Sequence, residues 1–264
     1  MEKPPLIGFK KKKLLGIELA DVSIAQAINC AKDGGLILAP SAPGLCGLDS
    51  DPYYREALKG ADLNLPDSGL AILMMRFLGM GELPRTSGLG FIDAQLKDQA
   101  LKDPGVTFWV MPSHESMKRN LRWLRSRGIP VTEAHCYVAP IYAKTGPLED
   151  QALLRRIEGT RPRYVILCIG GGIQERLGLF LKRSLPYRPA ICCIGAAIGF
   201  LSGDQVKIPR WADRLCLGWL LRTLSDPRRF LPRYFKALRL VWLILRYREA
   251  APIMKGIPVG RSMH

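Results

Sequence analysis

The feature that most constrains the fold is a regular alternation between short apolar runs and segments with helical spacing. Residues 36–39, 106–111, 164–169 and 190–194 are apolar except for Thr107, and each run has the length of one buried strand. Strands that are apolar on both faces are typical of parallel sheets, because helices cover both sides of such sheets. The alternation therefore predicts an α/β fold with a mostly parallel, doubly wound sheet and helices on both faces.

Weaker patterns fill the rest of this region. We expect further strands over residues 61–65 and 130–137, an edge strand over residues 14–19, and an irregular loop over residues 40–44. The helical segments are expected over residues 23–31, 52–59, 70–78, 91–101, 115–127 and 148–158 and from residue 174.

The chain changes character after Gly203, where no strand pattern remains. Residues 1–13 predict a loose basic tail, residues 14–203 an α/β domain, and residues 204–264 a basic helical appendage. Two or three helices are expected in the appendage, with breaks at Pro209, Pro227 and Pro232.

Positive charge is concentrated in this appendage. Residues 206–249 hold eleven basic and three acidic residues, a net +8, which is half of the chain's net charge of +16. Such an excess indicates an anionic partner, which could be a nucleic acid, a nucleotide, a diphosphate or an acidic lipid.

The last helical segment carries both charge and large apolar side chains. Its basic residues on one stripe are Arg229, Arg233, Lys236, Arg239 and Arg246, and its main apolar residues are Phe230, Phe235, Leu238, Val241, Trp242 and Leu245. A basic helix rich in Trp, Phe and Leu is typical of a segment that lies in the membrane interface. The alternative is a helix that packs back on the domain with solvated arginines. No run approaches the length of a membrane-spanning helix and no convincing signal peptide is present, so we expect a cytoplasmic protein.

One carboxylate lies where ligands usually bind in α/β folds. Asp67 follows the apolar run of residues 61–65, and a helical pattern begins directly after it. Ligands bind in the crevice outside the carboxyl ends of parallel strands, which makes Asp67 a candidate catalytic residue. The alternative is that Asp67 only caps the next helix through a backbone N–H two or three residues on.

Several classes of site find little support. The three glycines from Gly170 begin like a dinucleotide fingerprint, but Glu175 occupies the place of the third glycine, and no Walker lysine follows a glycine loop. The histidines and the seven cysteines show no metal-ligand spacing, and no nucleic-acid-binding module is recognisable. We therefore expect no cofactor, no metal and no nucleic-acid partner, and reduced cysteines in the core.

Several motifs of the chain are similar to those of a known family. These motifs are LPDSG at residues 65–69, Gln174-Glu175 after the glycine turn, IGAAIGFLSG at residues 194–203, KIPRW at residues 207–211, Trp219, Arg222, DPRR at residues 226–229, and Arg233-Tyr234. In this order and spacing the chain resembles the WecG/TagA/CpsF glycosyltransferases from about Leu14 to Tyr247. Members transfer a sugar from a UDP-sugar to a lipid-diphosphate-linked sugar acceptor on a bacterial membrane.

The resemblance implies a Rossmann-like core, an appendage that binds the inner face of the membrane peripherally, and inverting, metal-independent transfer of a hexosyl or N-acetylhexosaminyl group. Asp67 then matches the position of the family's general base. A homo-oligomer is an allowed assembly. Diphosphate-binding candidates are Arg210, Arg214 and Arg222, followed by Arg85 and Arg228. Further substrate-binding candidates are Ser41, Ser68, Gly69, Tyr137 (stacked on uracil), Gly170, Gln174, Glu175 and Lys207.

The chain departs from the family pattern at several polar positions. The departures are Ala39, Ser41, Gly90, Ile173, Gly199 and Gly218, and five of these six lose a hydrogen-bonding or charged side chain. They motivate a second hypothesis, in which the protein is a catalytically weak relative that binds a nucleotide sugar or lipid intermediate as an assembly partner.

Overall fold

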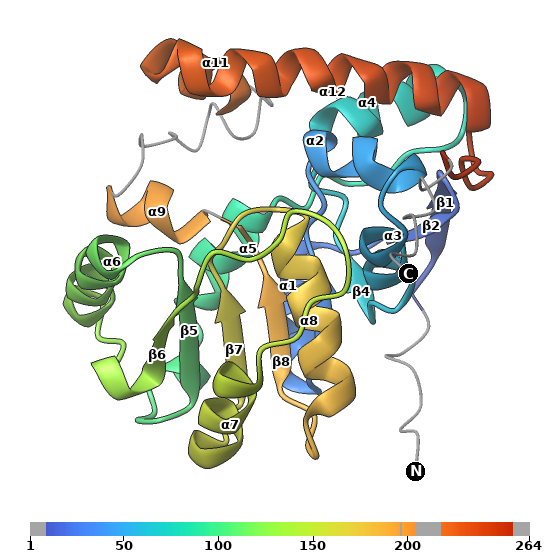
Figure 1. Cartoon of the computed structure of the whole chain (residues 1–264). Coiled ribbons are helices and arrows are strands. Elements are labelled where there is room, and N and C mark those ends of the chain that lie inside the picture. The colour runs from blue at the N-terminus through green and yellow to red at the C-terminus, as the bar shows by residue number, and fades with distance from the viewer. Residues whose placement is uncertain (1–8, 196, 204–217, 256–264) are drawn as a thin grey trace, which may run out of the picture.

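The apolar runs form the central sheet of the computed structural model, which describes residues 9–195, 197–203 and 218–255 (Figure 1). The strands of this sheet are β3 (Gly35–Leu38), β4 (Leu63–Asn64), β5 (Thr107–Met111), β6 (Cys136–Val138), β7 (Tyr164–Leu167) and β8 (Ala190–Cys193). Their spatial order is β4-β3-β8-β7-β5-β6, and every neighbouring pair is parallel. The predicted parallel, Rossmann-like α/β fold is confirmed.

Both faces of the sheet are buried. Successive side chains of a strand point to opposite faces, and apolar side chains lie on each of them. In β3, Leu36 and Leu38 belong to one core cluster, whereas Ile37 and Ala39 belong to the other. The first cluster is covered by α3 (Pro52–Lys59), α7 (Gln151–Thr160) and α8 (Ile173–Ser184). The second is covered by α1 (Ile24–Lys32), α5 (Gly88–Gln95), α6 (His114–Ser126) and α9 (Ala197–Ser202).

Shorter elements and the C-terminal helices complete the described chain. They are α2 (Ala42–Leu45), η1 (Cys46–Asp49), α4 (Gly69–Phe77), η2 (Gln99–Leu101), η3 (Glu133–His135), α11 (Gly218–Ser225) and α12 (Pro227–Tyr247). Two expectations change here. The segment predicted as an irregular loop contains α2, whose first turn tolerates Pro43. The strand expected from residue 130 begins only at Cys136, after η3.

The N-terminal expectation of a loose tail followed by an edge strand is wrong in the described part. Residues from Lys11 onward form an antiparallel hairpin of β1 (Lys11–Leu14) and β2 (Ile17–Ala20), separate from the main sheet. The turn residues Leu15 and Gly16 have φ values of 52° and 76°. Positive φ at both central residues is the geometry of a type I′ hairpin turn, so this pair folds the strand back on itself. Residues 1–8 lie outside the described chain.

The expected helix break at Pro232 is also wrong, because α12 runs from Pro227 through Pro232 to Tyr247. Pro227 occupies the first position of the helix, where proline is well tolerated. Pro232 lies in the second turn and removes only the bond to the carbonyl of Arg228. Pro209 lies outside the described residues. None of the described helices is long and apolar enough to cross a membrane.

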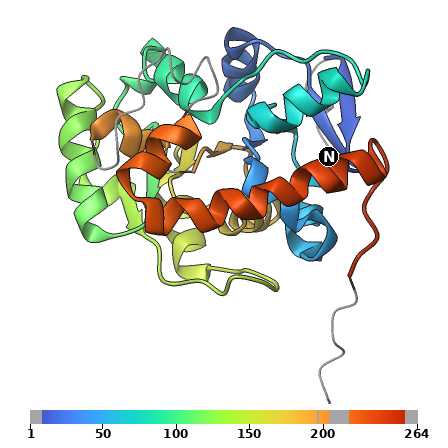
Figure 2. The ribbon, with the colours of Figure 1, turned by 90° about the horizontal axis from the view of Figure 1, so that it is seen from above.

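One face of α12 packs on the domain. Leu240, Leu243 and Ile244 are fully buried, in the same cluster as the strand residues Leu36 and Leu38. In Figures 1 and 2, α12 crosses the molecule over α2 and α4, on the side toward which the strands of the sheet point. The alternative interpretation, in which this helix packs back on the domain, therefore holds for one face.

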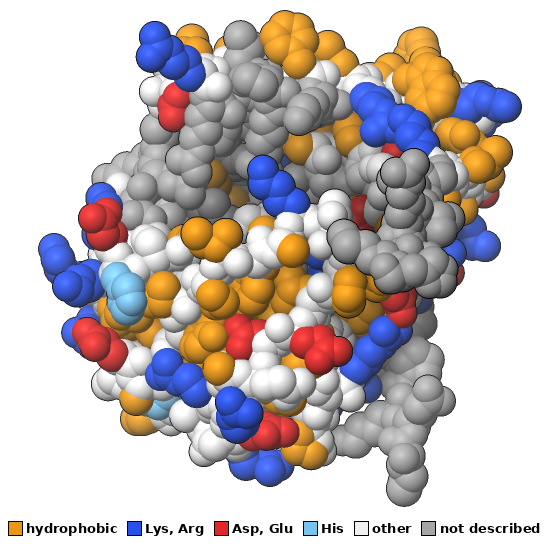
Figure 3. All heavy atoms as spheres, in the orientation of Figure 1, with side chains coloured by type: hydrophobic (Ala, Val, Ile, Leu, Met, Phe, Trp, Pro, Cys, Tyr) orange, Lys and Arg blue, Asp and Glu red, His pale blue; other side chains and the backbone are white. Residues whose placement is uncertain are grey.

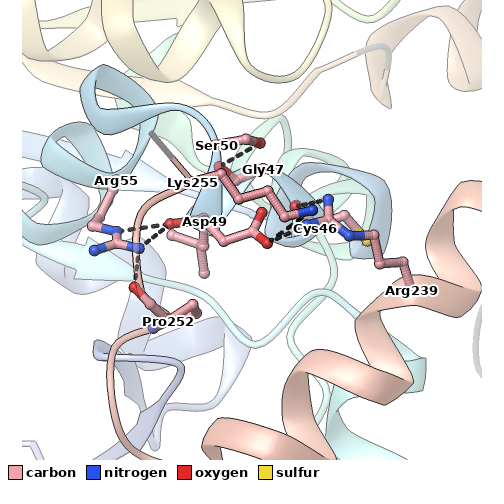
Figure 4. A network of polar contacts seen from close by, with 9 residues as sticks. Cys46, Gly47, Asp49, Ser50, Arg55, Arg239, Pro252 and Lys255 are labelled. Carbon is pink, nitrogen blue, oxygen red and sulfur yellow. Dashed lines mark hydrogen bonds and ion pairs between the residues drawn. The ribbon is translucent and has the colours of Figure 1, made fainter. Parts of the chain in front are cut away.

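A buried carboxylate joins α12 to the domain (Figure 4). Asp49, at the end of η1, is 2% exposed, and its Oδ2 pairs with Arg239 of α12. Lys255 donates its backbone N–H to the Asp49 carbonyl over 2.7 Å, and its Nζ lies 3.7 Å from Oδ2. Arg55 donates from Nε to the Leu48 carbonyl over 2.7 Å. Arg239 is therefore committed to an ion pair, not solvated as expected.

The segment after α12 packs on the N-terminal hairpin. The amide of Leu15 donates to the carbonyl of Arg248 over 2.8 Å, and that of Gly16 donates to Glu249 over 2.9 Å. A side chain at Gly16 would meet Ala251, whose Cβ lies 2.5 Å from the position of an added Cβ. Glycine is required here both by its positive φ and by this close approach.

Gly16→Ala should therefore destabilise the protein more than Gly128→Ala. Both glycines have φ of 76°, but nothing lies within 4 Å of an added Cβ at Gly128. The control variant isolates the conformational cost, about 1–2 kcal/mol, and Gly16→Ala adds an overpacking cost of about 1–3 kcal/mol. Urea unfolding measures both free energies, and equal losses would contradict the contact with Ala251.

Candidate active site

The carboxyl ends of β3, β4 and β8 surround the switch point of the sheet. The chain passes from β3 outward to β4 and builds the other strands on the opposite side of β3, so the topology reverses between β3 and β8. Such a reversal opens a crevice at the carboxyl ends of the strands. Ser41 and Asp67 each follow their strand by three residues, which brings both to this edge.

The side chain of Asp67 does not cap the helix that follows it. Ser68 caps α4, since its Oγ accepts the backbone N–H of Ala71 over 3.2 Å. Asp67 Oδ1 instead accepts the N–H of Gly88, the first residue of α5, over 3.0 Å. The capping interpretation of Asp67 is therefore wrong, and the carboxylate lies at the N-terminus of a different helix.

Asp67 therefore lies where α5 presents its first backbone donors. The first N–H groups of a helix lack intrahelical partners, and the helix dipole adds partial positive charge there. Asp67 is half-buried, so its carboxylate is reachable from the crevice but less screened than on an open surface. A general base needs an ionised carboxylate that a substrate hydroxyl can reach.

A basic side chain lies beside this carboxylate. Arg85 donates from Nε to the backbone carbonyl of Asp67 over 3.0 Å, and Thr86 donates its amide to Pro66 over 3.1 Å. These two bonds align the segment before α5 with the segment before α4. The structure therefore brings Arg85 and Asp67 together, although 18 positions separate them in the chain.

The contribution of Gly88 was missed from the sequence. The helix was expected from residue 91, whereas α5 begins at Gly88 with Ser87 as its cap, which accepts the Gly90 amide over 3.0 Å. Two glycines in the first turn lower helix propensity, which hid the start. A serine directly before this turn was the available signal.

The side chains of Gln174 and Glu175 are bound to the backbone of neighbouring loops. Gln174 Oε1 accepts the N–H of Gly195 over 2.8 Å, which ties the turn after β7 to the turn after β8. Glu175 accepts the N–H of Gly172 over 2.6 Å and lies at the start of α8. Both side chains are 2% exposed. They hold the glycine turn in place, and direct contact with a nucleotide stays a prediction.

Glu175 carries an ionisable carboxyl group although its side chain is buried. Burial raises its pKa above the ordinary value, and hydrogen bonds from its own backbone amide, Gln174 and Gly172 oppose that shift. Exposed Gly170 lies in the same turn, where its carbonyl accepts the amide of Gln174 over 3.2 Å. The turn is therefore exposed to solvent at Gly170, whereas the side chain of Glu175 is buried against it.

Tyr137 lies at the far end of the sheet from Asp67. Tyr137 is in β6 and Asp67 follows β4, and five strand spacings separate these edge strands, roughly 24 Å. Its hydroxyl donates to Asp150 over 2.9 Å, and burial and this bond raise the pKa of Tyr137 to about 12. Its ring lies 5.8 Å from the guanidinium of Arg156. Stacking of Tyr137 on uracil stays a prediction, and the separation argues against a shared ligand with Asp67.

Arg176 is a further buried residue that the sequence did not reveal. It is 4% exposed and donates to four backbone carbonyls at 2.6–3.0 Å. The acceptors are Gly172, Ala143, Lys144 and Gly146. Arg176 thereby fastens the loop between β6 and α7 to the start of α8, at the same edge of the sheet as Asp67.

The remaining basic candidates belong to the C-terminal segment. Arg228 is exposed in the first turn of α12, and Arg222 lies in α11, with its side chain outside the described part. Lys207, Arg210 and Arg214 lie outside the described residues. Gly69 is the first residue of α4.

Among the residues that the structure describes, no group of three His, Cys, Asp or Glu could hold a metal ion. The six cysteines of this part are buried and take part in no disulfide.

Comparison with known proteins now identifies the family. The sequence pattern described as the Glycosyl transferase WecG/TagA/CpsF family matches residues 12–252. The chain belongs to this glycosyltransferase family. A similar protein is the N-acetylglucosaminyldiphosphoundecaprenol N-acetyl-beta-D-mannosaminyltransferase of Bacillus spizizenii, which is 23% identical over 220 residues, covering 81% of this chain and 80% of the relative. The expected family is confirmed over nearly the whole chain.

The buried carboxyl of Glu175 predicts a pH-dependent difference between the wild type and Glu175→Gln. Because the pKa is raised in the folded state, the native protein binds a proton more tightly than the unfolded chain. The free energy of unfolding of the wild type should therefore rise relative to that of Glu175→Gln as the pH falls from about 8 to about 5. Thermal unfolding across this range measures the effect. The exposed Glu149→Gln is the control, and parallel pH profiles for the wild type and Glu175→Gln would contradict the raised pKa.

Proposed function

We propose that this protein transfers a hexosyl or N-acetylhexosaminyl group from a UDP-sugar to a lipid-diphosphate-linked sugar acceptor in bacterial cell-surface polysaccharide synthesis. The observation that carries the proposal is the half-buried carboxylate of Asp67, held at the N-terminus of α5 in a chain of this glycosyltransferase family. The relative's name supports the classes of transferred sugar and of acceptor, since it describes transfer of an N-acetylmannosaminyl group to an N-acetylglucosaminyldiphosphoundecaprenol.

The reaction follows as an inverting displacement with Asp67 as base. Asp67 removes the proton of the acceptor hydroxyl, and the acceptor oxygen forms its bond to the anomeric carbon of the donor. The bond from that carbon to the UDP oxygen breaks, and UDP leaves with the bonding electron pair. Attack opposite to the leaving group inverts the anomeric centre, and the base acts on a proton within hydrogen-bond reach.

Charge develops on the diphosphate as UDP leaves, and arginines stabilise it without a metal ion. A guanidinium matches phosphate oxygens through two parallel bonds. Arg85 lies beside Asp67, and Arg222 and Arg228 belong to helices α11 and α12. Lys207, Arg210 and Arg214 complete the proposed set. Ser41, Ser68, Gly69 and Gly170 line the same edge through the turns after β3, β4 and β7.

The appendage of residues 204–264 would hold the protein on the inner face of the cell membrane. The side of α12 away from the domain exposes Phe235, Leu238, Trp242 and Leu245, each 52–63% exposed. A helix that is apolar on two opposite faces needs an apolar partner on each. The domain covers one face, and an acidic bilayer fits the other because the exposed Arg228 and Arg246 flank it.

Asp67→Asn should abolish transfer while leaving UDP binding intact. The amide oxygen can still accept the Gly88 bond, but it cannot take a proton from the acceptor, so turnover should fall by about 10²–10⁴-fold. Transfer of radiolabelled sugar and calorimetric titration with UDP measure the two properties. Asp93→Asn, in the same helix α5 but paired with Lys97, is the matched control.

Two other outcomes of this experiment carry information. Near-normal turnover in Asp67→Asn would remove Asp67 as the base. UDP binding by the wild type without transfer to any lipid-linked acceptor would favour the assembly-partner hypothesis, in which the lost polar residues leave binding but not catalysis.

Trp242→Ser combined with Leu245→Ser should weaken binding to vesicles of acidic lipid. Loss of two apolar side chains from a lipid contact predicts at least about a tenfold lower partition coefficient. Vesicle co-sedimentation measures it, with Ile141→Ser in the loop after β6 as the control for an exposed apolar residue elsewhere. Point variants are preferable to truncation, because removal of α12 would take Leu240 and Ile244 out of the core and uncover the residues that they pack on. Unchanged binding would place the membrane contact outside α12.

A further inference from the structure

The helix that begins directly after Asp67 has an exposed apolar face. In α4, Ala71 and Met75 are buried, whereas Leu73 and Phe77 are 63% and 81% exposed. Residues four apart lie on the same side of a helix, so Leu73 and Phe77 form one continuous patch. Two large apolar side chains at this exposure are unusual for a helix of a soluble domain, whose outer face is normally polar.

This patch lies on a helix that packs against α12. The two helices pack beside each other, and Leu70, Met74 and Leu78 of α4 contact the same core cluster that contains Leu240 and Leu243 of α12. Figures 1 and 2 show α4 and α12 in one outer layer over the ends of the strands. Figure 3 shows hydrophobic side chains along the upper edge of the molecule, over α12.

Basic side chains border this layer. Arg246 is exposed near the end of α12, and Arg76 is exposed between Leu73 and Phe77. Arg76 lies 3.2 Å from Glu82, but both side chains are more than 70% exposed, so this pair is weak and can exchange partners. An apolar centre with a basic border matches the interface of a bilayer that contains acidic lipids.

A second copy of the chain is a less suitable occupant for this surface. Each copy carries a net charge of +16, and the basic borders of two copies would face each other across the contact. Like charges brought together in this way oppose association. An acidic bilayer supplies both the apolar interior and the opposite charge.

We propose that α4 and α12 together form the lipid-binding surface, so that membrane contact begins on the helix that follows the catalytic Asp67. This inference rests on the proposed function. Phe77 lies ten residues after Asp67, which along a helix is about 15 Å. A lipid-linked acceptor whose chain remains in the bilayer beside Phe77 would therefore keep its diphosphate and sugars near Asp67, and α4 would couple membrane docking to acceptor delivery.

The test compares Leu73→Ser combined with Phe77→Ser against the α12 variant and against Ile141→Ser. The probe is a set of vesicles of phosphatidylcholine with phosphatidylglycerol, at low and high salt. The α4 variant should lose at least about tenfold in partitioning, and by a similar factor at both salt concentrations, because its contribution is apolar and not screened. UDP titration and thermal unfolding verify that the variant remains folded.

A second variant reports insertion directly. Phe77→Trp should retain vesicle binding and show additional tryptophan quenching by brominated lipid, relative to the wild type. Absence of additional quenching would overturn the inference, since the side chain would then remain outside the bilayer.

The remaining outcomes separate this inference from the proposed function. Loss of binding in the α12 variant but not in the α4 variant would overturn the role of α4 and leave the α12 contact intact. Normal binding in both would remove the membrane contact from this layer, while sugar transfer still tests the glycosyltransferase function. Conversion of an oligomer to a monomer by the α4 variant, with unchanged vesicle binding, would assign the patch to a second copy of the chain.

Discussion

The ion pair between Asp49 and Arg239 is the contact on which the arrangement of the C-terminal helices depends. A carboxylate that is 2% exposed needs a cation close by, because an unpaired buried charge is strongly destabilising. The cations that meet this need, Arg239 and Lys255, come from α12 and from the segment after it, about 190 residues further along the chain. The pair therefore specifies where α12 lies on the domain. Apolar packing of Leu240 and Leu243 holds the helix there but is less directional.

The position of α12 determines which surfaces remain for function. Once one face of the helix is committed to Asp49 and the core, Trp242 and Leu245 must face outward. That outward face lies in the same layer as α4, the helix that begins beside Asp67. Attachment to a membrane and access of a lipid-linked acceptor to the base would thus depend on one packing arrangement.

At the sheet edge, backbone N–H groups donate many of the hydrogen bonds that hold the polar side chains. Asp67 is supported by an amide of α5, and Gln174 and Glu175 are held by the amides of Gly195 and Gly172. Helix N-termini and glycine turns supply such donors without any charged side chain. Backbone donors thus hold these three side chains in place at the sheet edge, and this explains why Gly88 matters although it has no side chain.

The sequence alone determined the parallel α/β class, the limits of helices such as α3, and the location of Asp67 at a strand end. These features depend on local periodicity, caps and strand-to-helix order, which neighbouring residues encode directly. Tertiary structure alone decided which partner each polar group takes. Asp67 binds Gly88 of another helix, Arg239 pairs with Asp49 instead of meeting solvent, and Gln174 accepts the amide of Gly195 in the turn after β8. Each choice joins residues brought together only when the sheet and its helices pack, and no local pattern records such a distance.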